Sequence, residues 1–73
     1  MTPSEIQPLL QADSFRPMKI VTTRNGTFEV MVLSHLLLTA TQLYIGREIN
    51  DVGVPTKVSA IPLLQIMRLE PMS

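Results

Sequence analysis

The clearest pattern along the chain is an alternation of apolar and mostly polar side chains between residues 27 and 33. One side of this segment carries Phe28, Val30 and Val32. A period of two predicts a half-buried β-strand. The preceding residues 18–24 are rich in β-branched side chains, and Asn25-Gly26 between the two segments is the strongest short signal for a β-hairpin. The pattern therefore predicts two antiparallel strands at about residues 18–24 and 27–33.

The register of this hairpin can be predicted from the side chains that it would bury. A two-residue turn would place Lys19 opposite Val32, facing the core. A three-residue loop over residues 24–26 instead places Ile20 opposite Val30, and no lysine faces inward. A slip of one residue turns every side chain to the other face, so we favour the three-residue loop. It predicts one shared inner face made by Ile20, Phe28, Val30 and Val32.

Three more strands and a helix complete the predicted elements. The further strands are expected at about residues 42–49, 56–61 and 65–70. The segment 34–40 stays open, because a bent continuation of the second strand and a single helical turn both fit its short apolar run. In the last strand, Ile66 and Met67 should point to opposite faces, and Leu69 should share the side of Met67.

An N-terminal helix is expected over about residues 3–12. Thr2 followed by Pro3 and Glu5 matches a capping box with proline at the first helical position. Pro8 should make this helix irregular, because proline removes a backbone donor and clashes with the preceding turn.

The predicted fold is a single mainly β domain spanning residues 1–73. A short helix followed by five short strands, with a tight turn at Pro62 before the last, is the strand order of an Sm-like small barrel. Closing the barrel would also remove exposed strand edges. A curved five-stranded antiparallel meander with the helix across one face is the alternative, and the order of elements does not separate the two.

Six short segments of the chain form a recognisable pattern: Phe15 to Ile20, Asn25-Gly26, Phe28-Glu29-Val30, His35, Leu43-Tyr44-Ile45-Gly46 and Leu63 to Glu70. In these segments the chain resembles a group of small, uncharacterised bacterial proteins that are abundant in planctomycetes and their relatives. The sequence departs from the group's pattern at Met18, where an aromatic residue is expected, and at Leu36-Leu37, where proline and an acidic residue are expected. The resemblance implies a compact β-rich fold and no particular activity.

Composition narrows the range of functions. The 73 residues contain no cysteine, which excludes disulfides and thiolate metal sites, and the single histidine cannot hold a metal alone. Six basic and six acidic residues give no net charge, whereas a dedicated nucleic-acid binder normally has a basic excess. The sequence shows neither a secretory signal nor an apolar run of the roughly 20 residues that a membrane-spanning helix needs. We expect no cofactor and no membrane association, and a cytoplasmic location.

The sequence offers no recognisable catalytic group. His35 is the only side chain that titrates near neutral pH without perturbation. Its neighbour Ser34 is adjacent in the chain, and adjacent side chains rarely converge on one site. The acidic residues are scattered, with no pair suited to acid–base catalysis. We therefore expect a protein that is not an enzyme.

Two binding hypotheses remain. The chain has more apolar residues than one small core needs, which favours a homo-oligomer or a protein-interaction module. The expected interface residues are Met31, Leu37, Leu64, Met67 and Leu69. The alternative is an Sm-like RNA- or DNA-binding protein, whose phosphate contacts would come from Arg16, Lys19 and Arg24.

Overall fold

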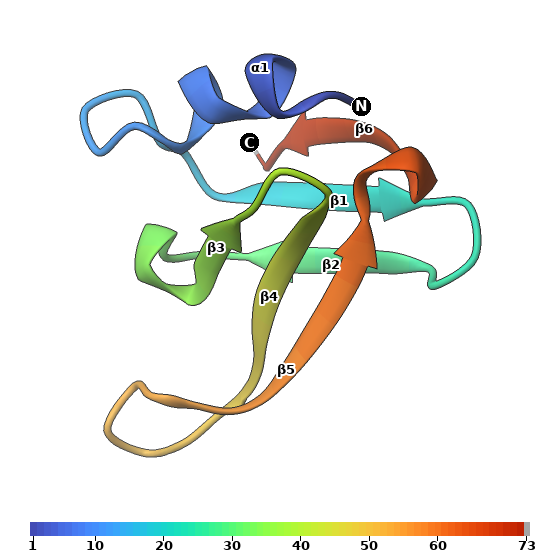
Figure 1. Ribbon diagram of the computed structural model, residues 1–73. Helices are drawn as coiled ribbons and strands as arrows, with labels where there is room; N and C mark the ends of the chain where they lie inside the picture. Colours follow the sequence, from blue (N-terminus) through green and yellow to red (C-terminus); the bar gives the residue numbers. More distant parts are fainter. Residues whose placement is uncertain (73) are drawn as a thin grey trace.

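Residues 1–72, which the computed structural model describes, form six strands in two three-stranded antiparallel sheets (Figure 1). The first sheet has the order β2-β1-β6 and consists of β2 (Thr27–Val30), β1 (Met18–Thr22) and β6 (Ile66–Pro71). The second has the order β3-β4-β5 and consists of β3 (Leu36–Leu38), β4 (Gln42–Ile49) and β5 (Pro55–Pro62). The mainly β architecture behind a short N-terminal helix is confirmed. The expected number of five strands is wrong, and within residues 1–72 the sheets do not close into a barrel.

The N-terminal helix begins as the sequence predicts but ends earlier. Helix α1 covers Pro3–Ile6, with Pro3 in its first turn, and a 3₁₀ turn, η1 (Gln7–Leu10), follows it. The change falls just before Pro8, which cannot continue the α-helical hydrogen bonds. At the start of the helix, the carboxylate of Glu5 accepts the Thr2 N–H at 3.0 Å. This hydrogen bond favours the charged carboxylate, so it lowers the pKa of Glu5.

The β1–β2 hairpin has the predicted faces but a different register. Met18 lies opposite Val30, and Ile20 lies opposite Phe28, so the predicted pairing of Ile20 with Val30 is wrong by two residues. A shift of two keeps each side chain on its original face, because the side chains of a strand alternate with a period of two. Ile20 and Val30 are buried, and Phe28 is half-buried against the core.

Thr22 explains the shift. Its N–H donates to the Gly26 carbonyl at 3.0 Å, and its hydroxyl donates to the same carbonyl at 2.7 Å. The Asn25 N–H in turn donates to the Thr22 hydroxyl at 2.9 Å. These bonds close a loop over residues 23–25, one residue earlier than predicted. Gly26 has a φ of +78°, a conformation that glycine adopts without strain.

The segment after β2 contains a helical turn, which is one of the two structures that the sequence left open, and then a separate strand instead of a continuation of β2. β2 ends at Val30, a 3₁₀ turn, η2, covers Leu33–His35, and β3 follows directly. Val32 lies beyond the strand and is 47% exposed, so its predicted place on the inner face is wrong. The chain leaves the first sheet at this point and enters the second.

The core lies between the inner faces of the two sheets and α1. Each strand except β3 contributes at least one buried apolar side chain, and the complete set is Ile6, Met18, Ile20, Val30, Leu43, Ile45, Ile61, Leu63 and Ile66. Burying one such side chain contributes about 1.5–3 kcal/mol relative to leaving it exposed. A 3₁₀ turn, η3 (Leu63–Gln65), follows the predicted break at Pro62 and carries the chain from β5 back to the first sheet.

Gly46 on β4 permits a close approach of the two strands of the β4–β5 hairpin. A Cβ atom at this position would lie 2.6 Å from Cγ and 2.8 Å from Cβ of Pro55. Both are atoms of a ring that cannot rotate away, and the carbonyl oxygen of His35 would lie at 3.3 Å from the same Cβ. The chain therefore needs glycine here for lack of space.

The substitution Gly46→Ala is expected to lower the free energy of unfolding by about 1–3 kcal/mol, because the added methyl overpacks the contact with Pro55. Urea unfolding followed by circular dichroism measures the change. In a double-mutant cycle with Pro55→Gly, the combined loss should be smaller than the sum of the single losses, because the second substitution frees the space. Additive losses would show that the ring of Pro55 is not the obstacle.

Candidate functional site

The outer face of the β3-β4-β5 sheet carries no charge over its paired rows. Leu37, Tyr44 and Ala60 lie side by side across the three strands, and Gly46 is paired with Val58 in the next row. Leu37 and Val58 are 63% and 64% exposed. We call this surface the apolar face, and it consists of Leu37, Gln42, Tyr44, Gly46, Val58, Ala60 and Pro62.

The outer face of the β2-β1-β6 sheet has the opposite character. Lys19 lies between Glu29 on β2 and Glu70 on β6, each its direct cross-strand neighbour. Glu70 also forms an ion pair with Arg68 at 3.4 Å. Oppositely charged neighbours at such positions are attractive. The molecule thus has one charge-balanced outer face and one without charge.

A groove with a volume of about 720 Å³ lies between the two sheets. It runs from the charged outer face, past β2 at the edge of its sheet, to the far half of β4. Its lining consists of Lys19, Val21, Thr27, Phe28, Glu29, Ile45, Gly46, Arg47, Glu48, Ile49, Arg68 and Glu70. The groove is therefore polar and joins the two sheets.

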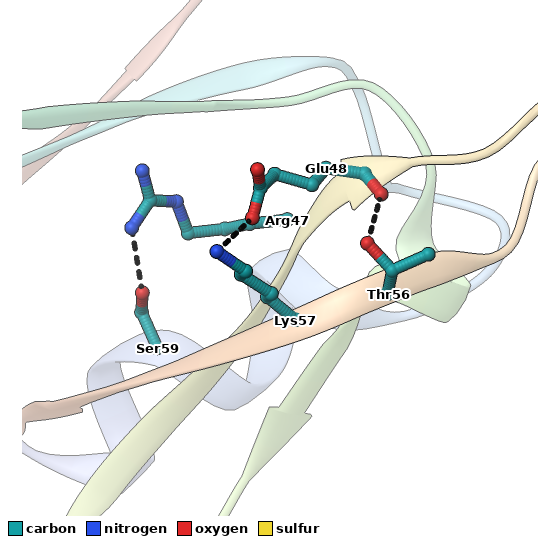
Figure 2. A network of polar contacts seen from close by, with 5 residues as sticks. All are labelled: Arg47, Glu48, Thr56, Lys57 and Ser59. Carbon is teal, nitrogen blue, oxygen red and sulfur yellow. Dashed lines mark hydrogen bonds and ion pairs between the residues drawn. The ribbon is translucent and has the colours of Figure 1, made fainter.

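Arg47 is held in a defined position beside this groove. Its guanidinium carbon lies 5.4 Å from the centre of the Phe28 ring, which is a cation–π contact between the two sheets. One guanidinium nitrogen, Nη1, donates to the hydroxyl of Ser59 on β5 at 3.1 Å (Figure 2). Within residues 1–72, no carboxylate lies within ion-pairing distance of this guanidinium. An ordered guanidinium without an acidic partner can bind an anion.

Glu48 follows Arg47 with an unusual backbone. Its φ is +53°, in the left-handed region that costs a non-glycine residue about 1–2 kcal/mol. Two contacts accompany this conformation (Figure 2): the Thr56 hydroxyl donates to the Glu48 carbonyl at 2.7 Å, and Lys57 Nζ lies 2.9 Å from the Glu48 carboxylate. Both side chains of the ion pair are largely exposed, so it contributes only about 0–1 kcal/mol.

The three basic residues of the nucleic-acid hypothesis lie apart from one another. Arg16 precedes β1 and donates to the carbonyl of Phe15, Arg24 lies in the turn after β1, and Lys19 lies between two carboxylates. Five strand residues separate the two arginines, a length of about 17 Å. The structure does not gather these side chains into one continuous basic surface.

The five residues of the predicted interface also divide between several places. Leu37 belongs to the apolar face, Met31 follows β2, and Leu64 in η3 is 93% exposed. Met67 is exposed on β6, whereas Leu69 packs against the core. The prediction that Leu69 shares the side of Met67 is wrong, because a β-bulge between the Val21–Arg68 and Thr22–Ile66 pairs makes Met67 an extra residue.

His35 joins two segments of the fold. Its Nε2 lies 3.3 Å from the carbonyl oxygen of Gly53, in the loop between β4 and β5. Residues 1–72 hold no group of three or more side chains that could bind a metal ion. In the same part of the chain, no helix is long and apolar enough to cross a membrane.

The sequence contained part of the signal for the Arg47 site. Alternation along β4 places Leu43, Ile45 and Arg47 on one face, so an arginine follows two buried residues toward the core. Its contact with Phe28 depends on how the two sheets pack against each other, and no local pattern encodes that. The strained backbone of Glu48 has no sequence signal either.

Comparisons with protein-family models, with curated proteins and with solved structures found no significant match for this chain.

Replacement of Glu48 tests the strain at this position. Glu48→Gly and Glu48→Ala both remove the ion pair with Lys57, but only glycine accepts the positive φ without cost. We expect the glycine variant to be more stable than the alanine variant by about 0.5–1 kcal/mol, measured by thermal or urea unfolding. Equal stabilities, or a more stable alanine variant, would contradict the strained conformation.

Proposed function

We propose that this chain is a non-enzymatic protein-interaction module that pairs with a second copy of itself through the apolar face. One observation carries the proposal: the paired rows of the β3-β4-β5 sheet carry the exposed Leu37 and Val58 and the half-buried Tyr44, without any charged side chain. The core of a protein interface is likewise depleted of charged residues and enriched in aromatic ones.

A second copy is the occupant that fits this face best. In a two-fold symmetric dimer each surface meets its own copy, so a charged face would meet like charges at its centre. The apolar face avoids this repulsion, and two sheets can stack face to face at about 10 Å. A standard interface buries about 800 Å² per partner, about one sixth of the 4826 Å² that this chain exposes.

Leu37→Lys and Val58→Lys test the proposal, because each brings charge into the centre of the face. We expect the unmodified chain to show a dimer mass that falls on dilution in analytical ultracentrifugation, and both variants to be monomeric over the same range. Val52→Lys is the matched control, since Val52 is 75% exposed in the loop after β4 and lies outside the face. A monomer mass for the unmodified chain at every concentration would refute the proposal.

An Sm-like nucleic-acid-binding protein is the alternative proposal. One observation favours it: Arg16 and Arg24 are exposed at the two ends of β1, and within residues 1–72 neither forms an ion pair. Lys19 adds little to such a surface, because Glu29 and Glu70 flank it. The charge-balanced face therefore supports this function less well than the apolar face supports pairing.

Binding of short oligonucleotides at low salt tests the alternative. If it is correct, fluorescence anisotropy should show binding that weakens steeply with added salt. Arg16→Gln and Arg24→Gln should each reduce the affinity, and Arg68→Gln, on β6 opposite Val21, serves as a comparison. No binding at low salt would remove this function from consideration.

A further inference from the structure

The edge of β2 beside this groove has no neighbouring strand among residues 1–72. There β2 pairs with β1 alone and lies at the end of its sheet. Thr22 donates to Gly26, so Gly26 and every second residue after it direct their backbone groups toward β1. By the same alternation, Thr27 and Glu29 direct their N–H and C=O groups toward the open edge. These two residues also line the groove.

The opposite wall of the groove is also an incompletely paired strand. β3 pairs with β4 only as far as Ile45, so residues 46–49 of β4 have a partner on the β5 side alone. Thr27, Phe28 and Glu29 of β2 line the groove together with residues 45–49 of β4, so the two strands lie on either side of it. In Figure 1 the far end of the β4–β5 hairpin projects beyond β2. The groove of about 720 Å³ therefore lies between two strands that each lack a neighbour there.

The charged side chains along the groove indicate which kind of peptide would bind there. Each groove carboxylate has a basic neighbour, and the pairs are Glu29 with Lys19, Glu48 with Lys57, and Glu70 with Arg68. Arg47 is the remaining cation, fixed by Phe28 and Ser59. A carboxylate can accept two parallel hydrogen bonds from a guanidinium, which makes an acidic side chain the natural partner.

We propose that the groove binds an extended peptide that adds as a strand to the free edge of β2 and places one acidic side chain on the guanidinium of Arg47. Main-chain hydrogen bonds to Thr27 and Glu29 supply sequence-independent affinity, and the carboxylate supplies specificity. The groove shares only Gly46 with the apolar face, and its other lining residues lie outside that face, so a chain paired through the apolar face can still bind the peptide.

The test uses fluorescent seven-residue peptides rich in valine and threonine, with glutamate, glutamine or lysine at the centre. Anisotropy with the full chain should show the glutamate peptide binding about tenfold or more tightly than the glutamine peptide. Arg47→Gln should remove this difference, whereas the matched control Arg24→Gln should keep it.

Methylating alternate backbone nitrogens of the peptide should abolish binding, because it removes the donors that an added strand needs. Amide chemical shifts should change at residues 27–30 and 46–49.

Three results would overturn the inference: no binding of the glutamate peptide, a preference that survives Arg47→Gln in a variant with unchanged melting temperature, or shift changes confined to other residues. Displacement of the peptide by a short oligonucleotide of higher affinity would assign the groove to nucleic acid instead. The monomeric Val58→Lys variant should bind the glutamate peptide as the unmodified chain does. This measurement distinguishes a failure of peptide binding in the groove from a failure of self-association through the apolar face.

Discussion

The hydrogen bonds of Thr22 at the hairpin turn constrain much of the remaining fold. A buried hydroxyl that donates to Gly26 and accepts from Asn25 fixes where the chain reverses. That choice places Phe28 opposite Ile20 and ends the paired part of β2 at Val30. As a result, the Phe28 ring meets Arg47 from the other sheet. One side-chain contact in a turn thus positions the residue pair that joins the two sheets beside the groove.

The sequence predicted the elements of the fold better than their pairing. Period-two alternation and the Asn25-Gly26 signal located the first two strands, and the capping residues located the start of α1. The register failed because the pattern records which face a residue occupies and not which residue lies opposite. A hydrogen bond from Thr22 decides that, and threonine in a strand gives no warning of it. The bulge at Met67 could not be predicted for a related reason. An extra residue in one strand is recognised only when the pairing with the neighbouring strand is known.

The candidate sites were predictable only in part for the same reason: the sequence does not show which residues become neighbours in space. The surplus of apolar residues was visible in the composition, and Leu37 does lie on the apolar face. The other expected interface residues are distributed over η3, β6 and the segment after β2, because the sequence could not assign them to a common surface. Arg47 shares the face of Leu43 and Ile45 by alternation along β4, but this pattern alone did not mark it as part of a site. Its role as a positioned guanidinium depends on Phe28 and Ser59, which reach it from two other strands.

The cation–π contact between Arg47 and Phe28 helps to hold the β4–β5 hairpin against the first sheet. Beyond Ile45, the β4–β5 hairpin has left its β3 partner and extends as an arm past the first sheet (Figure 1). Two contacts hold this arm against the rest of the molecule: that of Arg47 with Phe28 and that of His35 with Gly53. Both are polar contacts at the surface, where water competes for them, and not interlocked aliphatic side chains. The width of the opening between the arm and β2 therefore depends on two polar contacts, whereas packed aliphatic side chains hold the core behind it.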